Sequence, residues 1–254
     1  MTVTVVLFFG HLCLGVLVGS FLTAFIDELL VEEGIFTVNP QCTNCSNSKV
    51  KSLASIISLI LQRGKCPECG RKMSPMCLAL GPINATVYAM LSLTFGFRLG
   101  LIYLSLLFSL LLAIVVVDLK TYEIPILFQM LLCVFALLQI ILTPTEPLSV
   151  LARIIVYFVV IKLLKTATEK LTGREVIGEG DVKLIVICGS MLNLEYMSPF
   201  LLFTGILGII LGLVWKEDKK WKLFPLSPAI ALTFYPLLIH HCSFLWLRNY
   251  NFIK

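Results

Sequence analysis

Long apolar runs separated by short polar links restrict the fold of this sequence more than any other feature. A helix needs roughly 20 residues to cross a bilayer. Seven runs approach that length, at about Val3–Ile26, Leu78–Phe97, Leu99–Val117, Pro125–Leu142, Leu148–Leu164, Pro199–Trp215 and Pro225–Trp246. A shorter run lies at Val182–Leu194. Because 58% of the residues are hydrophobic and the mean hydropathy is +0.96, lipid is the expected solvent. We expect an all-α polytopic membrane protein with about eight transmembrane helices.

The basic residues lie between the apolar runs and predict the orientation. If all the runs cross, most Lys and Arg residues fall on one side, in the segments 27–77, 118–124, 165–183 and 216–222. That side is expected to be cytoplasmic, because basic loops are retained inside. If Val182–Leu194 were instead a buried or re-entrant helix, the lysines between residues 216 and 222 would be translocated, so we favour eight crossings over seven. The net charge of +5 therefore reports topology, since a nucleic-acid site would need one basic patch with interleaved aromatic residues.

Two carboxylates stand out because the predicted topology puts them at the same membrane face. Asp118 directly follows an apolar run, and the chain continues Leu-Lys-Thr-Tyr-Glu-Ile-Pro to Pro125. Asp181 lies in the segment Gly178-Glu-Gly-Asp-Val-Lys183 at the start of the short run. Two neighbouring carboxyls share a proton, so one can activate water while the other donates to a carbonyl oxygen. Glycines on both sides of Glu179 allow a peptide to approach closely.

Each aspartate taken alone has a simpler interpretation as a solvated carboxylate at a helix end, and Asp181 as a helix cap. The pair at matching depth favours a catalytic dyad. A helix N-terminus favours an anion and a C-terminus disfavours one. On that basis we expect Asp181 to be the more acidic member and Asp118 to hold the shared proton.

Four of the nine cysteines form two Cys-x-x-Cys pairs, Cys42 with Cys45 and Cys66 with Cys69, with 20 residues between the pairs. This is the ligand spacing of a structural zinc site with four thiolates. Disulfides or an unmetallated remnant are the alternatives, and a reducing cytoplasm disfavours disulfides. The predicted organisation is a retained first transmembrane helix at 1–26, a cytoplasmic tetracysteine loop at 27–77 and a seven-helix membrane core at 78–254.

Several segments together resemble the type IV prepilin peptidases, which are aspartyl peptidases of the Gly-x-Gly-Asp type. The segment Gly178–Lys183 matches the family's Gly-x-Gly-Asp-x-Lys signature, and Asp118–Pro125 is similar to its first aspartate box. Phe224-Pro-Leu-Ser-Pro228 resembles its Pro-Phe-Gly-Pro segment, and Gly19-Ser-Phe-Leu22 its Gly-Ser-Phe-Leu-Asn. In that family a tetracysteine loop also follows the first span.

The resemblance implies a multi-pass enzyme of the bacterial cytoplasmic membrane, with Asp118 and Asp181 catalytic, Gly178, Gly180 and Lys183 shaping the site, and prepilin, pseudopilin or competence pilin precursors as substrates. It also implies S-adenosylmethionine-dependent methylation of the new N-terminus. Three departures in the first region bear on that second activity: Thr23 replaces Asn, Glu28 stands where Arg is usual, and Gly81 replaces Glu. No cofactor residues are assigned.

Two other functions remain open: intramembrane cleavage in the manner of presenilin, and a metal-bearing scaffold or transporter without enzymatic activity. Other polar residues receive structural interpretations. His240 and His241 are expected to have polar roles at a helix end, and Arg153 and Lys162 to extend toward the membrane surfaces. Glu179 is not assigned to the site.

Overall fold

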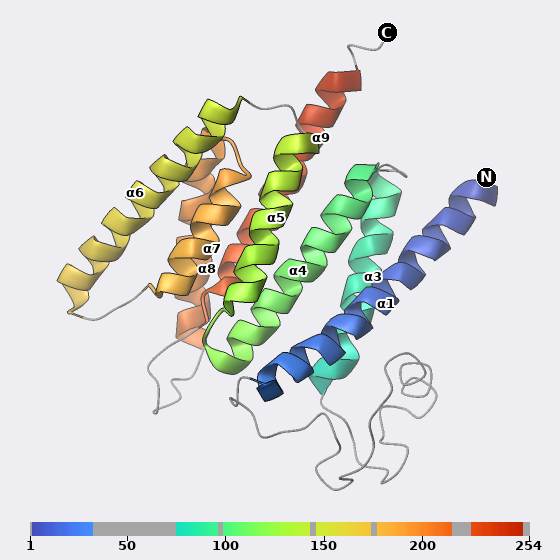
Figure 1. Cartoon of the computed structure of the whole chain (residues 1–254), viewed down its shortest axis with the longest axis horizontal. Helices are drawn as coiled ribbons and strands as arrows, with labels where there is room; N and C mark the ends of the chain where they lie inside the picture. The colour runs from blue at the N-terminus through green and yellow to red at the C-terminus, as the bar shows by residue number, and fades with distance from the viewer. Residues whose placement is uncertain are drawn as a thin grey trace, which may run out of the picture. The chain divides into compact units, whose positions relative to one another are not determined.

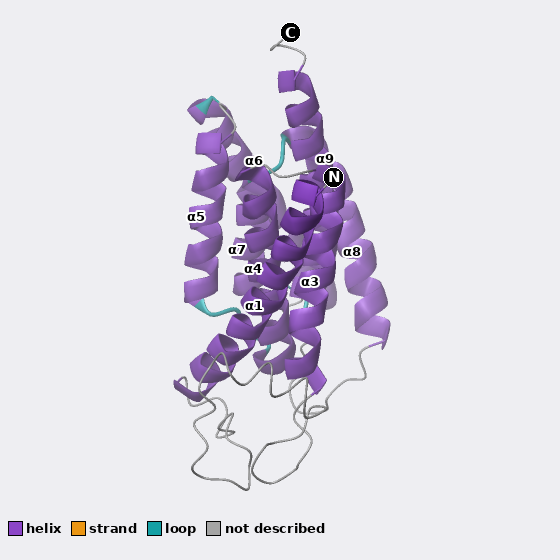
Figure 2. Ribbon diagram, turned by 90° about the vertical axis from the view of Figure 1, so that its right-hand side faces the viewer, coloured by secondary structure: helices purple, strands orange, loops and turns teal. Residues whose placement is uncertain are grey.

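The structure is a computed structural model that describes residues 2–32, 75–95, 99–142, 146–173, 177–214 and 225–250. Within those ranges the regular elements are all helices, with no strand (Figure 2). They are α1 (Thr2–Glu32), α3 (Pro75–Phe95), α4 (Leu99–Thr121), α5 (Ile126–Leu142), α6 (Pro147–Thr172), α7 (Glu179–Ser190), the short 3-10 helix η1 (Leu194–Tyr196), α8 (Met197–Val214) and α9 (Ser227–Tyr250). Each predicted apolar run therefore corresponds to a helix, and the all-α prediction is confirmed.

Four described helices contain segments long and apolar enough to cross a membrane: Val6–Thr23, Gly100–Thr121, Pro147–Leu171 and Leu194–Val214. The apolar segments Ala79–Phe95 and Ile126–Ile141 are shorter. Many large apolar side chains on these helices are exposed, as expected of a surface that contacts lipid. The count of eight crossings stays a prediction.

The chain divides into two compact units, residues 1–109 and residues 110–254. In the first unit α1 packs closely on α3 through glycines one helical turn apart. A Cβ on Gly15 would lie 2.7 Å from the Ala85 Cα, and one on Gly19 would lie 2.7 Å from the carbonyl oxygen of Leu80. Small residues at this spacing are typical of tightly packed membrane helices. The Gly19 segment matched by the resemblance thus has a packing role in this chain.

The second unit surrounds α7, which packs against α5, α6 and α9. Figure 1 shows α5, α7 and α9 running in one direction and α6 and α8 in the other. The inner face of α7 is apolar, with Val182, Leu184, Ile185 and Cys188 all buried. At 12 residues, α7 rises about 18 Å, which is short of the roughly 30 Å apolar thickness of a bilayer. Beyond α7 the chain continues as non-helical backbone before η1 and α8.

Side chains from neighbouring helices form hydrogen bonds with that non-helical segment. Gln139 of α5 donates from Nε2 to the carbonyl oxygen of Met191 at 2.8 Å. Arg153 of α6 donates from Nη1 to Asn193 Oδ1 at 3.0 Å and, at 3.4 Å, to the carbonyl oxygen of Leu192. Irregular backbone in an apolar environment needs such partners because no water is present. Arg153 therefore does not extend to the membrane surface as expected, but turns inward and is buried.

Helices α6 and α7 approach closely at Gly189. A Cβ on Gly189 would overlap the aromatic ring of Tyr157, which is completely buried and has no space to move away. The glycine thereby sets the separation between α6 and α7 near the C-terminal end of α7.

We expect Gly189→Ala to destabilise the protein by about 1 to 3 kcal/mol, because the added methyl group overpacks this contact. Gly205→Ala is the matched control: Gly205 lies in α8, and a Cβ there would meet nothing within 4 Å. Alanine favours a helix over glycine by up to about 1 kcal/mol, so this variant should be as stable as the wild type or more so. Thermal unfolding in detergent micelles, followed by circular dichroism, measures both. Equal changes in Tm would contradict the packing argument.

Candidate active site

Asp118 lies near the end of α4, and its side chain is buried. The helix continues one turn past it and closes at Tyr122, which adopts a left-handed conformation with φ +58°. The N–H of Glu123 donates to Thr121 Oγ1 at 3.2 Å in the turn that follows. The segment after Asp118 therefore forms a compact connection to α5 and keeps the carboxylate inside the unit.

The Asp118 carboxylate contacts the first residue of α9. The backbone N–H of Ser227 donates to Asp118 Oδ2 at 3.1 Å, and Ser227 is itself fully buried. The first N–H groups of a helix have no partners within the helix, and the positive end of the helix dipole attracts an anion. The segment around Pro225 and Pro228, which resembles a family motif, thus places a helix N-terminus against Asp118.

Asp181 is the third residue of α7, and two glycines lie close to it in the sequence and in space. Gly178 precedes α7 in an extended conformation, and a Cβ there would lie 3.2 Å from Asp181 Oδ2. Gly180 packs on Ile124 in the α4–α5 connection, where a Cβ would lie 3.7 Å from that side chain. Both glycines therefore lie close to Asp181 or to the α4–α5 connection, whereas the side chain of Lys183 is exposed.

The two aspartates come together within the second unit. Figure 1 shows the end of α4 and the start of α7 at the same end of this unit. Burial raises the pKa of Asp181 to about 7, and the negative charge of Asp118 contributes to the rise. The backbone N–H of Gly178 and the ammonium group of Lys165 partly oppose it. A pKa near neutrality is the behaviour expected of a pair of neighbouring carboxyls that share one proton.

The contacts of the two carboxyls bear on which of them holds that proton. Asp118 lies at the C-terminal end of α4, but its carboxylate accepts a hydrogen bond from the N-terminus of α9, which favours the ionised form. Asp181 has a raised pKa even though it begins a helix. The raised pKa of Asp181 favours it as the holder of the shared proton, whereas the sequence assigned that proton to Asp118.

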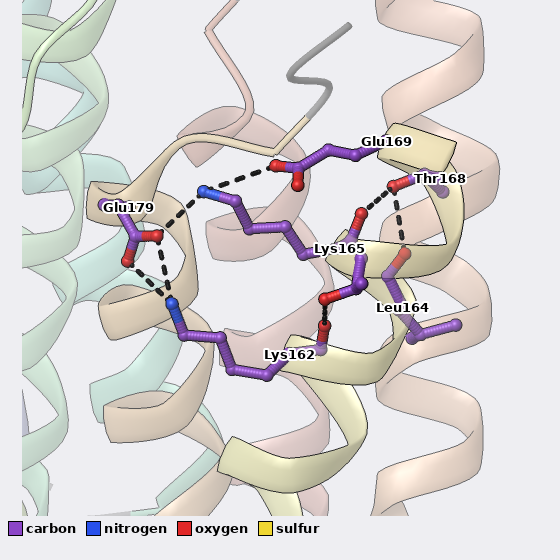
Figure 3. Close-up of polar contacts among 7 residues, drawn as sticks. Lys162, Leu164, Lys165, Thr168, Glu169 and Glu179 are labelled. Atoms are coloured by element: carbon purple, nitrogen blue, oxygen red, sulfur yellow. Dashed lines mark hydrogen bonds and ion pairs between the residues drawn. The ribbon is translucent and has the colours of Figure 1, made fainter. Parts of the chain in front are cut away.

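A cluster of charged residues beside Asp181 was not anticipated as part of the site. Glu179, the first residue of α7, accepts hydrogen bonds from Lys162 and Lys165 of α6 (Figure 3). Lys162 therefore pairs with a carboxylate and does not simply extend to the membrane surface. The only signal in the sequence is a pair of lysines three positions apart near the end of an apolar run. The sequence does not reveal which face of that helix meets α7.

The remaining predicted residues divide into two groups. Cys42, Cys45, Cys66 and Cys69 lie outside the described residues, and no cluster of potential metal ligands occurs within the described ranges. His240 hydrogen-bonds through Nδ1 with the hydroxyl of Tyr196 at 3.0 Å, and with His241 it lies about 20 Å along α9 from Ser227. The histidines are therefore remote from the aspartates.

Comparisons with known proteins agree with this geometry. Residues 105–213, which include both aspartates, match the type IV leader peptidase family, and residues 13–95 match the bacterial peptidase A24 N-terminal domain. A protein of Bacillus subtilis (strain 168) named prepilin leader peptidase/N-methyltransferase is 25% identical over 223 residues, which is 85% of this chain and 88% of that protein.

Proteins with the same name from Neisseria gonorrhoeae and Pectobacterium carotovorum subsp. carotovorum are 22% identical over 246 residues and 24% identical over 236 residues. These matches cover 87% and 84% of this chain, and 86% and 85% of the relatives. No solved structure matches the chain significantly. The two matched regions, which together span most of the sequence, and these long alignments show that the chain belongs to the type IV leader peptidase family.

Proposed function

We propose that this protein is a membrane aspartyl endopeptidase that removes the leader peptide of prepilin-like precursors, with Asp118 and Asp181 as its catalytic pair. The main support is the arrangement of these carboxyls in one unit, where the charge of Asp118 acts on Asp181. The relatives' shared name, prepilin leader peptidase, agrees with this chemistry.

The two carboxyls have different roles in the proposed mechanism. Asp118, ionised and held by the N–H of Ser227, accepts a proton from a water molecule. The water oxygen attacks the carbonyl carbon of the scissile peptide bond, and Asp181 donates its proton to the carbonyl oxygen. When the tetrahedral intermediate collapses, Asp181 takes back the hydroxyl proton, Asp118 gives its proton to the leaving amine and the C–N bond breaks. The dyad then holds one proton again, as at the start.

The substrate follows from the family and from the predicted topology. A prepilin, pseudopilin or competence pilin precursor has a short basic leader followed by an apolar helix that can lie in the membrane. With the aspartates at the cytoplasmic face of a bacterial inner membrane, the junction between leader and helix would reach them. Cleavage deeper in the apolar segment is the presenilin-like alternative, and mapping the cut position distinguishes the two.

Co-expression with a prepilin, followed by mass spectrometry of the pilin N-terminus, tests the activity. We expect Asp118→Asn and Asp181→Asn each to abolish processing, because neither variant can supply both the acid and the base. Glu146→Gln, at an exposed position before α6, is the control and should process normally. Processing that persists in both Asn variants would exclude the dyad. Ion flux that the two substitutions abolish would support the transporter alternative instead.

The same spectra report methylation of the new N-terminus. The names of the relatives include N-methyltransferase, and we include S-adenosylmethionine as the methyl donor in the proposal. An added methyl group on the cleaved pilin would support this second activity, and its absence with complete cleavage would limit the proposal to the peptidase.

The hydrogen bond from Ser227 to Asp118 is testable with a matched pair of substitutions. Ser227→Pro removes the N–H donor at a first helical position, where proline fits well, whereas Ser227→Ala removes only the hydroxyl. A hydrogen bond to a charged group contributes about 1.5 to 3 kcal/mol, so we expect kcat to fall roughly 10- to 100-fold in the proline variant. The alanine variant should lose much less. Equal losses would show that the N–H of Ser227 does not act on the dyad.

We also propose that Cys42, Cys45, Cys66 and Cys69 bind a structural zinc ion, because four thiolates in two Cys-x-x-Cys pairs suit tetrahedral zinc. Elemental analysis of the purified protein should find about one zinc ion per chain. Paired substitution of Cys42 and Cys66 by serine should remove it, while Cys133→Ser, at an exposed position on α5, should not. Zinc content that the paired substitution leaves unchanged would contradict the site, and a zinc-free protein whose mass rises on reduction would indicate disulfides.

A further inference from the structure

The start of α7 is fastened to α6 by one carboxylate and two ammonium groups (Figure 3). Lys162 Nζ lies 3.0 Å from Glu179 Oε1 and 3.1 Å from Oε2, and Lys165 Nζ lies 2.9 Å from Oε1. Lys165 also lies 3.7 Å from Glu169 Oε1 on the next turn of α6. We refer to Lys162, Lys165 and Glu179 as the Glu179 clamp.

The members of the clamp differ in their exposure to solvent. The side chain of Glu179 is 56% exposed and that of Lys162 is 38% exposed, whereas Lys165 is only 8% exposed. A buried ammonium group is costly without anionic partners. Glu179 therefore compensates the charge of Lys165, whose ammonium group has little contact with water. The two lysines hold the pKa of Glu179 at about 2, so its carboxylate stays ionised across the physiological range.

The clamp acts close to the dyad. Glu179 and Asp181 lie in the first turn of α7, and between them Gly180 packs on Ile124. The N-terminus of α7 has no side-chain cap, so its position depends on the packing of Gly180 and on the bonds to Glu179. The charged groups that act on Asp181 in the described structure are Asp118 from α4 and Lys165 from α6, with opposite effects.

We propose that the Glu179 clamp positions Asp181 and controls its protonation, through the charge of Lys165 and the extent to which Glu179 compensates it. The proposal rests on the peptidase function proposed above. The three residues of the clamp are positioning residues that do not touch the scissile bond. Since Asp181 must donate a proton, activity declines as the pH rises through its pKa, about 7. The clamp therefore determines the pH at which activity declines.

Two substitutions should move the decline in opposite directions. Lys165→Met removes the cation near Asp181, so the protonated form persists to higher pH. Glu179→Gln keeps the size of the side chain but removes the charge that compensates Lys165, so the decline moves to lower pH. We expect each midpoint to shift by roughly half a pH unit, since a neighbouring charge changes a carboxyl's proton affinity by this order or more.

Other variants separate charge from position. Lys165→Arg keeps the cation and should restore the wild-type midpoint. Lys162→Met removes two bonds to Glu179 but leaves the charge of Lys165, so kcat should fall roughly two- to five-fold with little change in midpoint. Lys170→Met, at an exposed position later on α6, is the control and should match the wild type in both measurements.

The measurement is the initial rate of prepilin cleavage by purified protein in detergent micelles between pH 5 and 9, roughly the range in which a carboxyl with this raised pKa titrates. Midpoints that shift in opposite directions for Lys165→Met and Glu179→Gln support the clamp. Unchanged midpoints, or shifts in the same direction, overturn it even if the rates fall. If Lys165→Met does not fold, Glu179→Gln against wild type still decides the direction. A wild-type protein that does not cleave prepilin refutes the peptidase function itself. A wild-type protein that cleaves prepilin while the variants leave the midpoint unchanged refutes only the clamp.

Discussion

The hydrogen bond from the Ser227 backbone to Asp118 is the interaction on which the candidate site depends. An ionised carboxylate buried in an apolar unit is strongly disfavoured unless a donor replaces the water it has lost. The N-terminus of α9 supplies that donor together with the positive end of its dipole. The bond also joins the end of α4 to the start of α9, residues that are far apart in the sequence. Asp118 thus has a fixed position and a hydrogen-bond donor before any substrate binds.

The position of Asp181 depends on how the short helix α7 is packed within its unit. Regular hydrogen bonding ends near Ser190, and the next carbonyl groups need partners from elsewhere because lipid offers none. Gln139 and Arg153 supply them from α5 and α6, so polar side chains within apolar helices compensate for the missing helical turns. With Gly189 packed on Tyr157, these contacts fix α7 at one end, while Glu179 holds the other.

The helices and the aspartate pair could be predicted from the sequence because both depend on local patterns. Apolar runs define helices, and alternating crossings would place the end of α4 and the start of α7 on the same side. Ser227 could not be identified as a donor because its contribution is a backbone N–H, which every residue except proline carries. The pairing of Glu179 with Lys162 and Lys165 depends on which face of α6 meets α7, and the residues of α6 show no helical periodicity from which to infer that face.

The contact between Asp118 and Ser227 shows why a helix-dipole argument must be made for the carboxylate and not for the residue. Asp118 belongs to α4, but its oxygen contacts α9, so the dipole of its own helix is the wrong one to consider. For Asp181, burial and the charge of Asp118 outweigh the N-terminus of α7. The two carboxyls therefore differ in how their surroundings can change: Asp118 is bound by a backbone group, and Asp181 is surrounded by charged side chains. A backbone donor keeps its character whatever side chain occupies position 227, proline excepted, whereas the side chains around Asp181 can change in charge. Differences in pH optimum between related enzymes are therefore expected to arise mainly on the Asp181 side of the pair.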